Sequence, residues 1–179
     1  PADIARLTEA IAGYKKDVAT ALAHPKPAEG FIGMEIKGTH YSEKEAAGRA
    51  VINACTELQG SDAISLGQYR GFFMSLQYDA DHTDYKLTMK GAMSHTISLG
   101  ADIFGNITRM DNLVDGLAKE LAEYQAALQD TCTQLTNAKA EMETPFAKEA
   151  ELVEKSVRLK ELNILLNMDQ KDKALLDEA

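Results

Sequence analysis

The stretch Phe72-Phe73-Met74-Ser75-Leu76-Gln77-Tyr78 decides the fold class, because it alternates Phe72, Met74, Leu76 and Tyr78 with Phe73, Ser75 and Gln77. A period of two places these two sets on opposite faces of a strand. The same period recurs in residues 85–89 and 93–99, and a shorter strand is expected near residues 64–69. Together these segments predict an antiparallel meander with one apolar face and one polar face.

The residues before the meander predict two helices and a short strand. Over residues 2–23, apolar positions are spaced by three and four, and the pattern stops at Pro25 and Pro27. A strand is expected over residues 31–37 and a turn over residues 38–41. Ser42 followed by Glu45 then predicts a capping box. The alanine-rich helix that follows is the expected cover for the apolar face of the meander.

The residues after the meander predict a long helical hairpin. Thr108 is an expected N-cap, with Asp111 in an acidic first turn. Apolar residues spaced by four and three predict one helix over residues 109–143, and Pro145 ends that pattern. A second helix is expected from about residue 146 to 166, antiparallel to the first, because the break between them is short.

The predicted fold class is therefore α+β, a small antiparallel sheet covered by a helix and followed by a coiled-coil hairpin. Four segments are expected: an N-terminal helix with a proline linker (1–27), a small α+β domain (28–107), the hairpin (108–168) and a frayed tail (169–179). The apolar side of the first helix needs a partner, so we expect it to pack on the hairpin or to pair between two chains. The start at Pro1, without an initiator Met, suggests a fragment of a longer protein.

Net charge and composition indicate which kinds of partner this chain is suited to bind. The net charge is −9, and fifteen of the 28 acidic residues lie in residues 111–179 with only eight of the 19 basic ones. That part of the chain is a poor candidate for binding a phosphate backbone. No signal peptide and no apolar run of membrane-span length are present, so we expect a cytoplasmic protein that does not use a membrane.

The sequence contains none of the common catalytic motifs. It lacks a phosphate-binding glycine loop, a His-Glu-x-x-His pair, a Cys-x-x-Cys pair and a Gly-x-Ser-x-Gly elbow. The four histidines are scattered, and His95 falls on the apolar face of its strand, where a hydrogen-bonded core residue is expected. We therefore expect no enzyme activity, no metal site and no cofactor in this chain.

The polar face of the meander is the candidate binding surface. It combines hydroxyl and amide groups with two lysines and one aromatic ring, which can contact phosphates and stack on a base. Its candidate nucleic-acid contacts are Phe73, Gln77, Lys86, Thr88 and Lys90, extended by Arg70 and Lys37. The alternative is a plain solvated face, because polar-out alternation is common to any one-sided sheet.

Several runs of residues together resemble one protein family. They are Phe31-Ile-Gly-Met-Glu-Ile-Lys-Gly38, Ser42-Glu-Lys-Glu-Ala-Ala-Gly48, Leu66-Gly-Gln-Tyr-Arg-Gly-Phe72, Lys90-Gly-Ala-Met-Ser-His-Thr-Ile-Ser-Leu-Gly100, Gly105-Asn-Ile-Thr-Arg-Met-Asp-Asn112 and Leu159-Lys-Glu-Leu-Asn-Ile-Leu-Leu-Asn167. These runs look like the extreme C-terminal region of the large DNA methylase and Swi/Snf-type helicase proteins of bacterial integrative and conjugative elements, which are similar to phage antirestriction proteins.

The resemblance implies a DNA-associated parent protein but supplies no active site, because the family's catalytic motifs have no counterpart in this sequence. We therefore expect a non-catalytic accessory domain that assists DNA engagement or target recognition, alongside the methylase and helicase domains of the parent chain. The alternative is a protein-interaction or dimerisation module that acts through the helical hairpin. The acidic hairpin favours the alternative, and the polar sheet face favours DNA.

Overall fold

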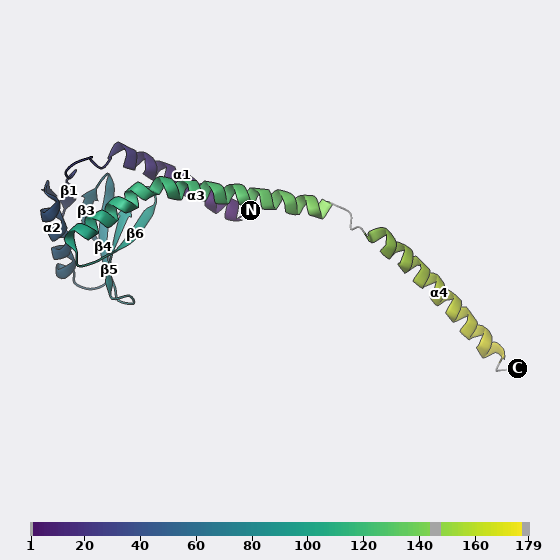
Figure 1. Ribbon diagram of the computed structural model, residues 1–179. Helices are drawn as coiled ribbons and strands as arrows, with labels where there is room; N and C mark the ends of the chain where they lie inside the picture. The colour runs from purple at the N-terminus through teal and green to yellow at the C-terminus, as the bar shows by residue number, and fades with distance from the viewer. Residues whose placement is uncertain (1, 144–147, 177–179) are drawn as a thin grey trace. The chain divides into compact units, whose positions relative to one another are not determined.

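The computed structural model describes residues 2–143 and 148–176, with side chains described as far as residue 167. Its elements follow in the order α1 (Ala2–Ala23), β1 (Met34–Ile36), β2 (Thr39–Tyr41), α2 (Lys44–Glu57), β3 (Ile64–Tyr69), β4 (Phe72–Asp79), β5 (Asp84–Lys90), β6 (Ser94–Leu99), α3 (Ile103–Glu143) and α4 (Glu149–Leu176). The predicted α+β class is confirmed (Figure 1). The chain divides into two compact units, residues 1–132 and 133–179.

The first unit is built on a six-stranded antiparallel sheet with the strand order β2-β1-β3-β4-β5-β6. From β3 to β6 the strands pair in sequence order, as the predicted meander requires. Phe73 lies opposite Lys90, and Gln77 lies opposite Lys86. The predicted alternation is therefore present in the structure, where Phe72, Met74 and Leu76 of β4 are buried and the residues between them are more exposed.

The strand β3 contains a bulge where the sheet meets its short strands. The pairing of β3 with β4 shifts register between Ser65 and Gly67. Gly67 has φ +149°, and a Cβ atom at this position would overlap the backbone carbonyl oxygen of Glu35 on β1. Only glycine combines this φ with such a close approach of two strands.

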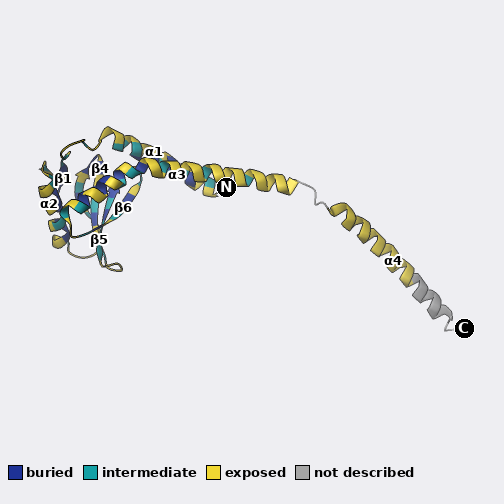
Figure 2. Cartoon of the chain, viewed as in Figure 1, coloured by how far each residue is buried: buried dark blue, intermediate teal, exposed yellow. Residues whose placement is uncertain are grey.

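Three helices share the cover of the apolar face. From α2 the core takes Ala47, Val51, Ala54 and Cys55, and from α3 it takes Ile107, Met110, Val114 and Leu117 (Figure 2). Tyr14 of α1 belongs to the same core. The helix α2, which the sequence predicted as the cover, lies mainly over β1 and β2, and α1 and α3 contribute the rest.

The helix α1 packs antiparallel to α3. Near the end of α1, His24 and Asp111 both bond to Arg70, whereas the middle residue Tyr14 donates to Glu120 at 2.6 Å and contacts the Tyr124 ring. The end of α1 thus lies near the first turns of α3, and earlier residues of α1 contact later residues of α3. The predicted packing of the first helix on the long helix is confirmed, and part of the apolar seam of α3 is occupied by α1.

The two predicted helix starts were wrong in detail. The capping box does not form, since Glu43 is the N-cap of α2 and makes no side-chain capping bond. The helix α3 begins at Ile103, where Asp102 accepts a hydrogen bond from the Phe104 N–H at 3.1 Å. Asp111 is buried two turns inside α3 instead of lying in its first turn. The predicted continuity over residues 109–143 is confirmed.

The region between α1 and α2 forms a hairpin where the sequence predicted one strand and a turn. The strand is shorter than expected, and residues 39–41 pair with it as β2. Lys37 and Gly38 make the turn, and both have positive φ values of 49° and 78°. A two-residue turn of this kind matches the twist of the flanking strands.

The second unit contains the end of α3 and the helix α4. The helix α4 continues to Leu176, so it includes most of the segment expected to be a frayed tail. Residues 144–147, with the predicted break at Pro145, lie outside the described residues. The antiparallel arrangement of α3 and α4 stays a prediction.

Candidate functional site

Five of the predicted contact residues share the exposed face of the sheet, which we call the open face. Phe73 and Gln77 lie on β4, and Lys86, Thr88 and Lys90 lie on β5 directly beside them. Their outward direction follows from the buried neighbours Met74, Leu76, Leu87 and Met89 on the same two strands. The sequence alone was sufficient to place these five residues on one surface.

Phe73 and Lys90 form the most distinctive pair on the open face. They are directly opposed across β4 and β5, and Phe73 is 61% exposed. Gln68 lies on the other side of Phe73, and Ser94 lies on the other side of Lys90. An exposed ring beside a cation, flanked by polar groups, can stack on a planar ligand while the amine meets an anion.

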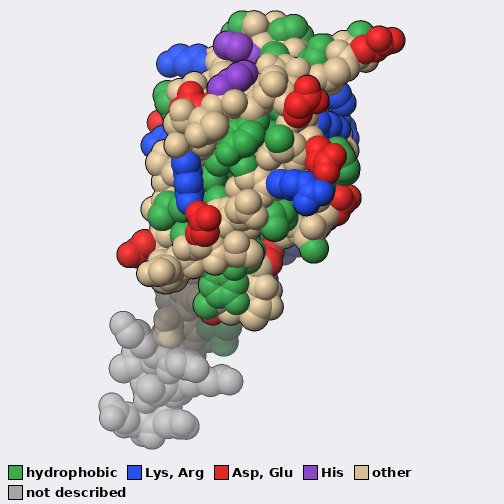
Figure 3. All heavy atoms as spheres, turned by 90° about the vertical axis from the view of Figure 1, so that its left-hand side faces the viewer, with side chains coloured by type: hydrophobic (Ala, Val, Ile, Leu, Met, Phe, Trp, Pro, Cys, Tyr) green, Lys and Arg blue, Asp and Glu red, His purple; other side chains and the backbone are tan. Residues whose placement is uncertain are grey.

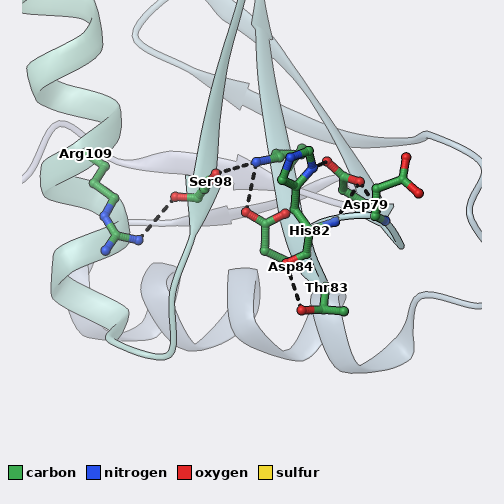
Figure 4. A network of polar contacts seen from close by, with 8 residues as sticks. Asp79, His82, Thr83, Asp84, Ser98 and Arg109 are labelled. Carbon is green, nitrogen blue, oxygen red and sulfur yellow. Dashed lines mark hydrogen bonds and ion pairs between the residues drawn. The ribbon is translucent and has the colours of Figure 1, made fainter.

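Lys86 is engaged within the protein. Its Nζ lies 2.9 Å from an Asp84 carboxylate oxygen and 2.6 Å from Ser98 Oγ. The hydrogen bond from Lys86, and then that from Ser98, hold the pKa of Asp84 below its usual range. Figure 4 shows this network continuing to Arg109 of α3, which donates to the Ser98 carbonyl. Lys86 would lose these bonds on moving to a phosphate.

The turn between β4 and β5 adds negative charge at the same end of the open face. Asp79 accepts hydrogen bonds from the backbone N–H groups of Asp81 and His82, and the His82 ring lies 2.7 Å away (Figure 4). The bond with the His82 ring is the main cause that lowers the pKa of the Asp79 carboxyl. These carboxylates offset the field of Lys86 for an approaching anion.

Arg70 does not belong to the open face, contrary to the prediction. It is buried at the turn between β3 and β4, where its Nη1 lies 2.8 Å from Asp115 and 3.2 Å from Asp111 of α3. Its Nε donates to the His24 carbonyl. Arg70 has φ +48°, so the strand alternation that would place it outward ends before it.

Lys37 is also directed away from the open face. It sits in the turn between β1 and β2, and its Nζ lies 2.7 Å from Glu57 of α2. Both errors have one cause: each residue is in a two-residue hairpin turn, where a positive φ replaces strand geometry. The dipeptides Lys37-Gly38 and Arg70-Gly71 could have indicated these turns in the sequence, since glycine is common in such turns.

The charge around the sheet is mixed instead of basic. On the open face, Lys86 and Lys90 are accompanied by Glu35, Asp79 and Asp84. At the end of the first unit that carries α2, basic and acidic side chains are interspersed (Figure 3). A surface that neutralises many phosphates shows a field of one sign, so the geometry gives limited support to a phosphate-binding face.

A buried cluster was only half anticipated from the sequence. His95 was expected to be a hydrogen-bonded core residue, and its Nε2 lies 2.8 Å from Asp17 of α1. Asp17 is 1% exposed and also accepts the backbone N–H groups of Ala92 and Met93. Asp17 lies one turn from Tyr14 on the apolar side of α1, and this position in the sequence could have indicated that its carboxylate would be buried. This cluster fastens α1 to the turn between β5 and β6.

The second unit presents a different kind of surface. Eight large apolar side chains of α4 are between 49% and 63% exposed: Leu152, Val153, Val157, Leu159, Leu162, Ile164, Leu165 and Leu166. In Figure 2 the described part of α4 is exposed throughout. A helix with this many apolar residues is normally buried against a partner.

Among the residues that the structure describes, no group of three or more His, Cys, Asp or Glu side chains is placed to hold a metal ion. Within the same residues, no helix has the length and apolarity to cross a membrane. Comparison with protein-family models, curated proteins and solved structures gave no significant match.

Proposed function

We propose that this chain is a non-catalytic accessory module that binds another protein through α4. The observation that carries the proposal is the exposure of eight large apolar side chains along residues 152–166. Burying the exposed half of such a side chain yields on the order of 1 kcal/mol. Eight of them supply several kcal/mol of gross interaction energy, which is the driving force that a helix-in-groove contact uses.

The parent protein is proposed from the resemblance in the sequence. The partners would be the methylase and helicase domains of a large protein from a mobile element, in the cytoplasm and in an antirestriction context. The first unit would then be a rigid support, since its buried Asp17 and Arg70 clusters tie α1, the sheet and α3 together. No step of the parent's chemistry is assigned to this chain.

The test is a titration of the full chain against the purified methylase and helicase domains of such a parent. The Val157→Glu/Ile164→Glu double variant, which alters exposed apolar positions of α4, should lose binding to the domain that binds. The control is Lys160→Gln/Asn167→Glu, which changes the charge by the same two units on a polar strip of α4 and should bind normally. Failure of both domains to bind the unaltered chain at about 100 μM would refute the proposal, since a functional contact is tighter than this.

The pair of Phe73 and Lys90 supports a second candidate, in which the open face engages DNA. The Phe73 ring would stack on a base, and Lys90 would contact a phosphate more readily than Lys86, which is already bonded. Losing the stack should cost about 1–3 kcal/mol. Losing one phosphate contact should lower the slope of affinity against salt by about one unit.

The measurement is a titration with single-stranded and double-stranded DNA at two salt concentrations. It compares the chain with Phe73→Ala and with Lys86→Ala/Lys90→Ala, and circular dichroism checks that both variants are folded. Unchanged affinity in the folded double variant, or no DNA binding at low salt, would leave the open face as a solvated surface.

A further inference from the structure

The exposed residues of α4 form two stripes on opposite sides of the helix. Successive helical residues are rotated by about 100°. On this spacing Leu152, Leu159, Leu162 and Leu166 share one side, which we call the leucine stripe. Val153, Val157 and Ile164 share the opposite side and form the β-branched stripe. Both stripes are exposed along their whole length.

Two opposite stripes require two partners. A single neighbouring helix covers one seam of a helix, as in a two-stranded coiled coil. If α3 and α4 form the predicted hairpin, one stripe of α4 is covered and the other stays in water. The helix α4 is therefore suited to an inner position in an assembly of at least three helices.

We propose that the leucine stripe pairs with the leucine stripe of a second copy of this chain, in an antiparallel arrangement. This inference rests on the proposed role of α4 as an interaction helix, and it names one of the partners. The leucines are spaced by seven, three and four, which is the a and d pattern of a coiled coil. Identical stripes that meet across a two-fold axis form a self-complementary interface.

The charges on α4 favour a second copy as the partner and an antiparallel orientation of the two helices. Residues 149–167 carry four acidic and three basic side chains, so two copies of α4 bring together almost no net charge. Lys155 occupies a d position in the leucine stripe. A parallel pair would place Lys155 against the partner's Lys155, and two like charges facing each other in a seam are unfavourable.

An antiparallel pair removes this conflict when it is centred between Leu159 and Leu162. Leu159 then meets the partner's Leu162, and Lys155 lies beside the partner's Leu166, where its long stem can cover apolar surface while the amine reaches water. On the flank of the seam, Ser156 faces the partner's Asn163. The contact is small compared with a standard interface, so we expect a dimer that dissociates on dilution.

The first experiment measures the oligomeric state of the full chain by sedimentation from about 5 μM to 500 μM, the range in which a small interface is expected to dissociate. The unaltered chain should shift from monomer to dimer. Leu159→Glu/Leu162→Glu should stay monomeric, whereas Val157→Glu/Ile164→Glu, which makes the same chemical change on the β-branched stripe, should still dimerise. A monomer at every concentration, or loss of the dimer in both variants, overturns the inference.

The second experiment tests the direction of the pair in a Cys132→Ser background. In the antiparallel pair the two copies of residue 152 lie about 25 Å apart along the axis, since they are separated by about 17 residues of rise. The Leu152→Cys variant should therefore form no cross-linked dimer on oxidation, and Ser156→Cys/Asn163→Cys should form one. The reverse pattern indicates a parallel pair and overturns the arrangement.

The two proposals fail separately. A chain that stays monomeric but binds the methylase or helicase domain refutes the second copy and leaves the proposed function intact. A chain that dimerises through the leucine stripe and binds neither domain supports this inference and refutes the proposed partners.

Discussion

The two carboxylates beside Arg70 allow a direct test of whether burial or distance decides the value of an ion pair. Asp111 and Asp115 both contact Arg70 Nη1, at 3.2 Å and 2.8 Å. The side chain of Asp111 is 4% exposed and that of Asp115 is 50% exposed. We predict that replacing the more distant partner, Asp111, with alanine destabilises the protein far more than Asp115→Ala does.

The expected losses in the free energy of unfolding depend on which groups each substitution leaves without a partner. Asp111 also accepts the Tyr69 hydroxyl at 2.9 Å, so Asp111→Ala leaves two buried donors without this acceptor. Arg70 keeps its contact with Asp115, so the cost is that of an unpaired buried hydroxyl and a buried cation with one partner fewer, about 3–5 kcal/mol for the two together. Asp115→Ala removes a half-exposed pair that contributes about 0–1 kcal/mol, part of which the better helix propensity of alanine offsets.

The assay is urea unfolding of both variants, followed by circular dichroism, with a thermal melt of the same samples. A loss of about 3–5 kcal/mol corresponds to a fall in Tm of roughly 10–20 °C for a unit of this size. Equal losses in the two variants, or a larger loss for Asp115→Ala, would refute the reasoning that burial governs this cluster.

Three further predictions concern other parts of the first unit. Gly67→Ala should lower the free energy of unfolding by more than about 2 kcal/mol, measured by urea unfolding, because a Cβ atom with φ +149° overlaps the Glu35 carbonyl. Asp17→Ala should cost about 3 kcal/mol and increase amide exchange across α1, since it removes the three hydrogen bonds that the buried Asp17 carboxylate makes. Burial raises the pKa of the Cys55 thiol to about 11, so a thiol reagent at pH 8 should modify exposed Cys132 in the native protein and both cysteines only after unfolding. Reaction of two thiols in the native state would contradict the last prediction.

The sequence by itself determined the elements whose period is strong and local. The alternation from Phe72 to Leu99 was sufficient to predict three paired strands and the side of the sheet on which their residues lie, including buried His95. The spacing from Met110 to Met142 was sufficient to predict one continuous helix. These features depend on neighbours within a few residues, so a single chain carries the information for them.

Only the tertiary structure decided which surfaces meet and which charges remain available. A row of apolar residues along a helix shows that the helix packs against something, but it does not show against what. The apolar row of α3 was expected to pack on the second helix of a hairpin, and part of it contacts α1 instead. Arg70 and Asp111 were read as a surface cation and a first-turn acid, and they are instead a buried pair 41 residues apart in the chain. Contacts over such distances are set by how the elements pack, because the energy of burying a charge depends on neighbours that no local pattern records.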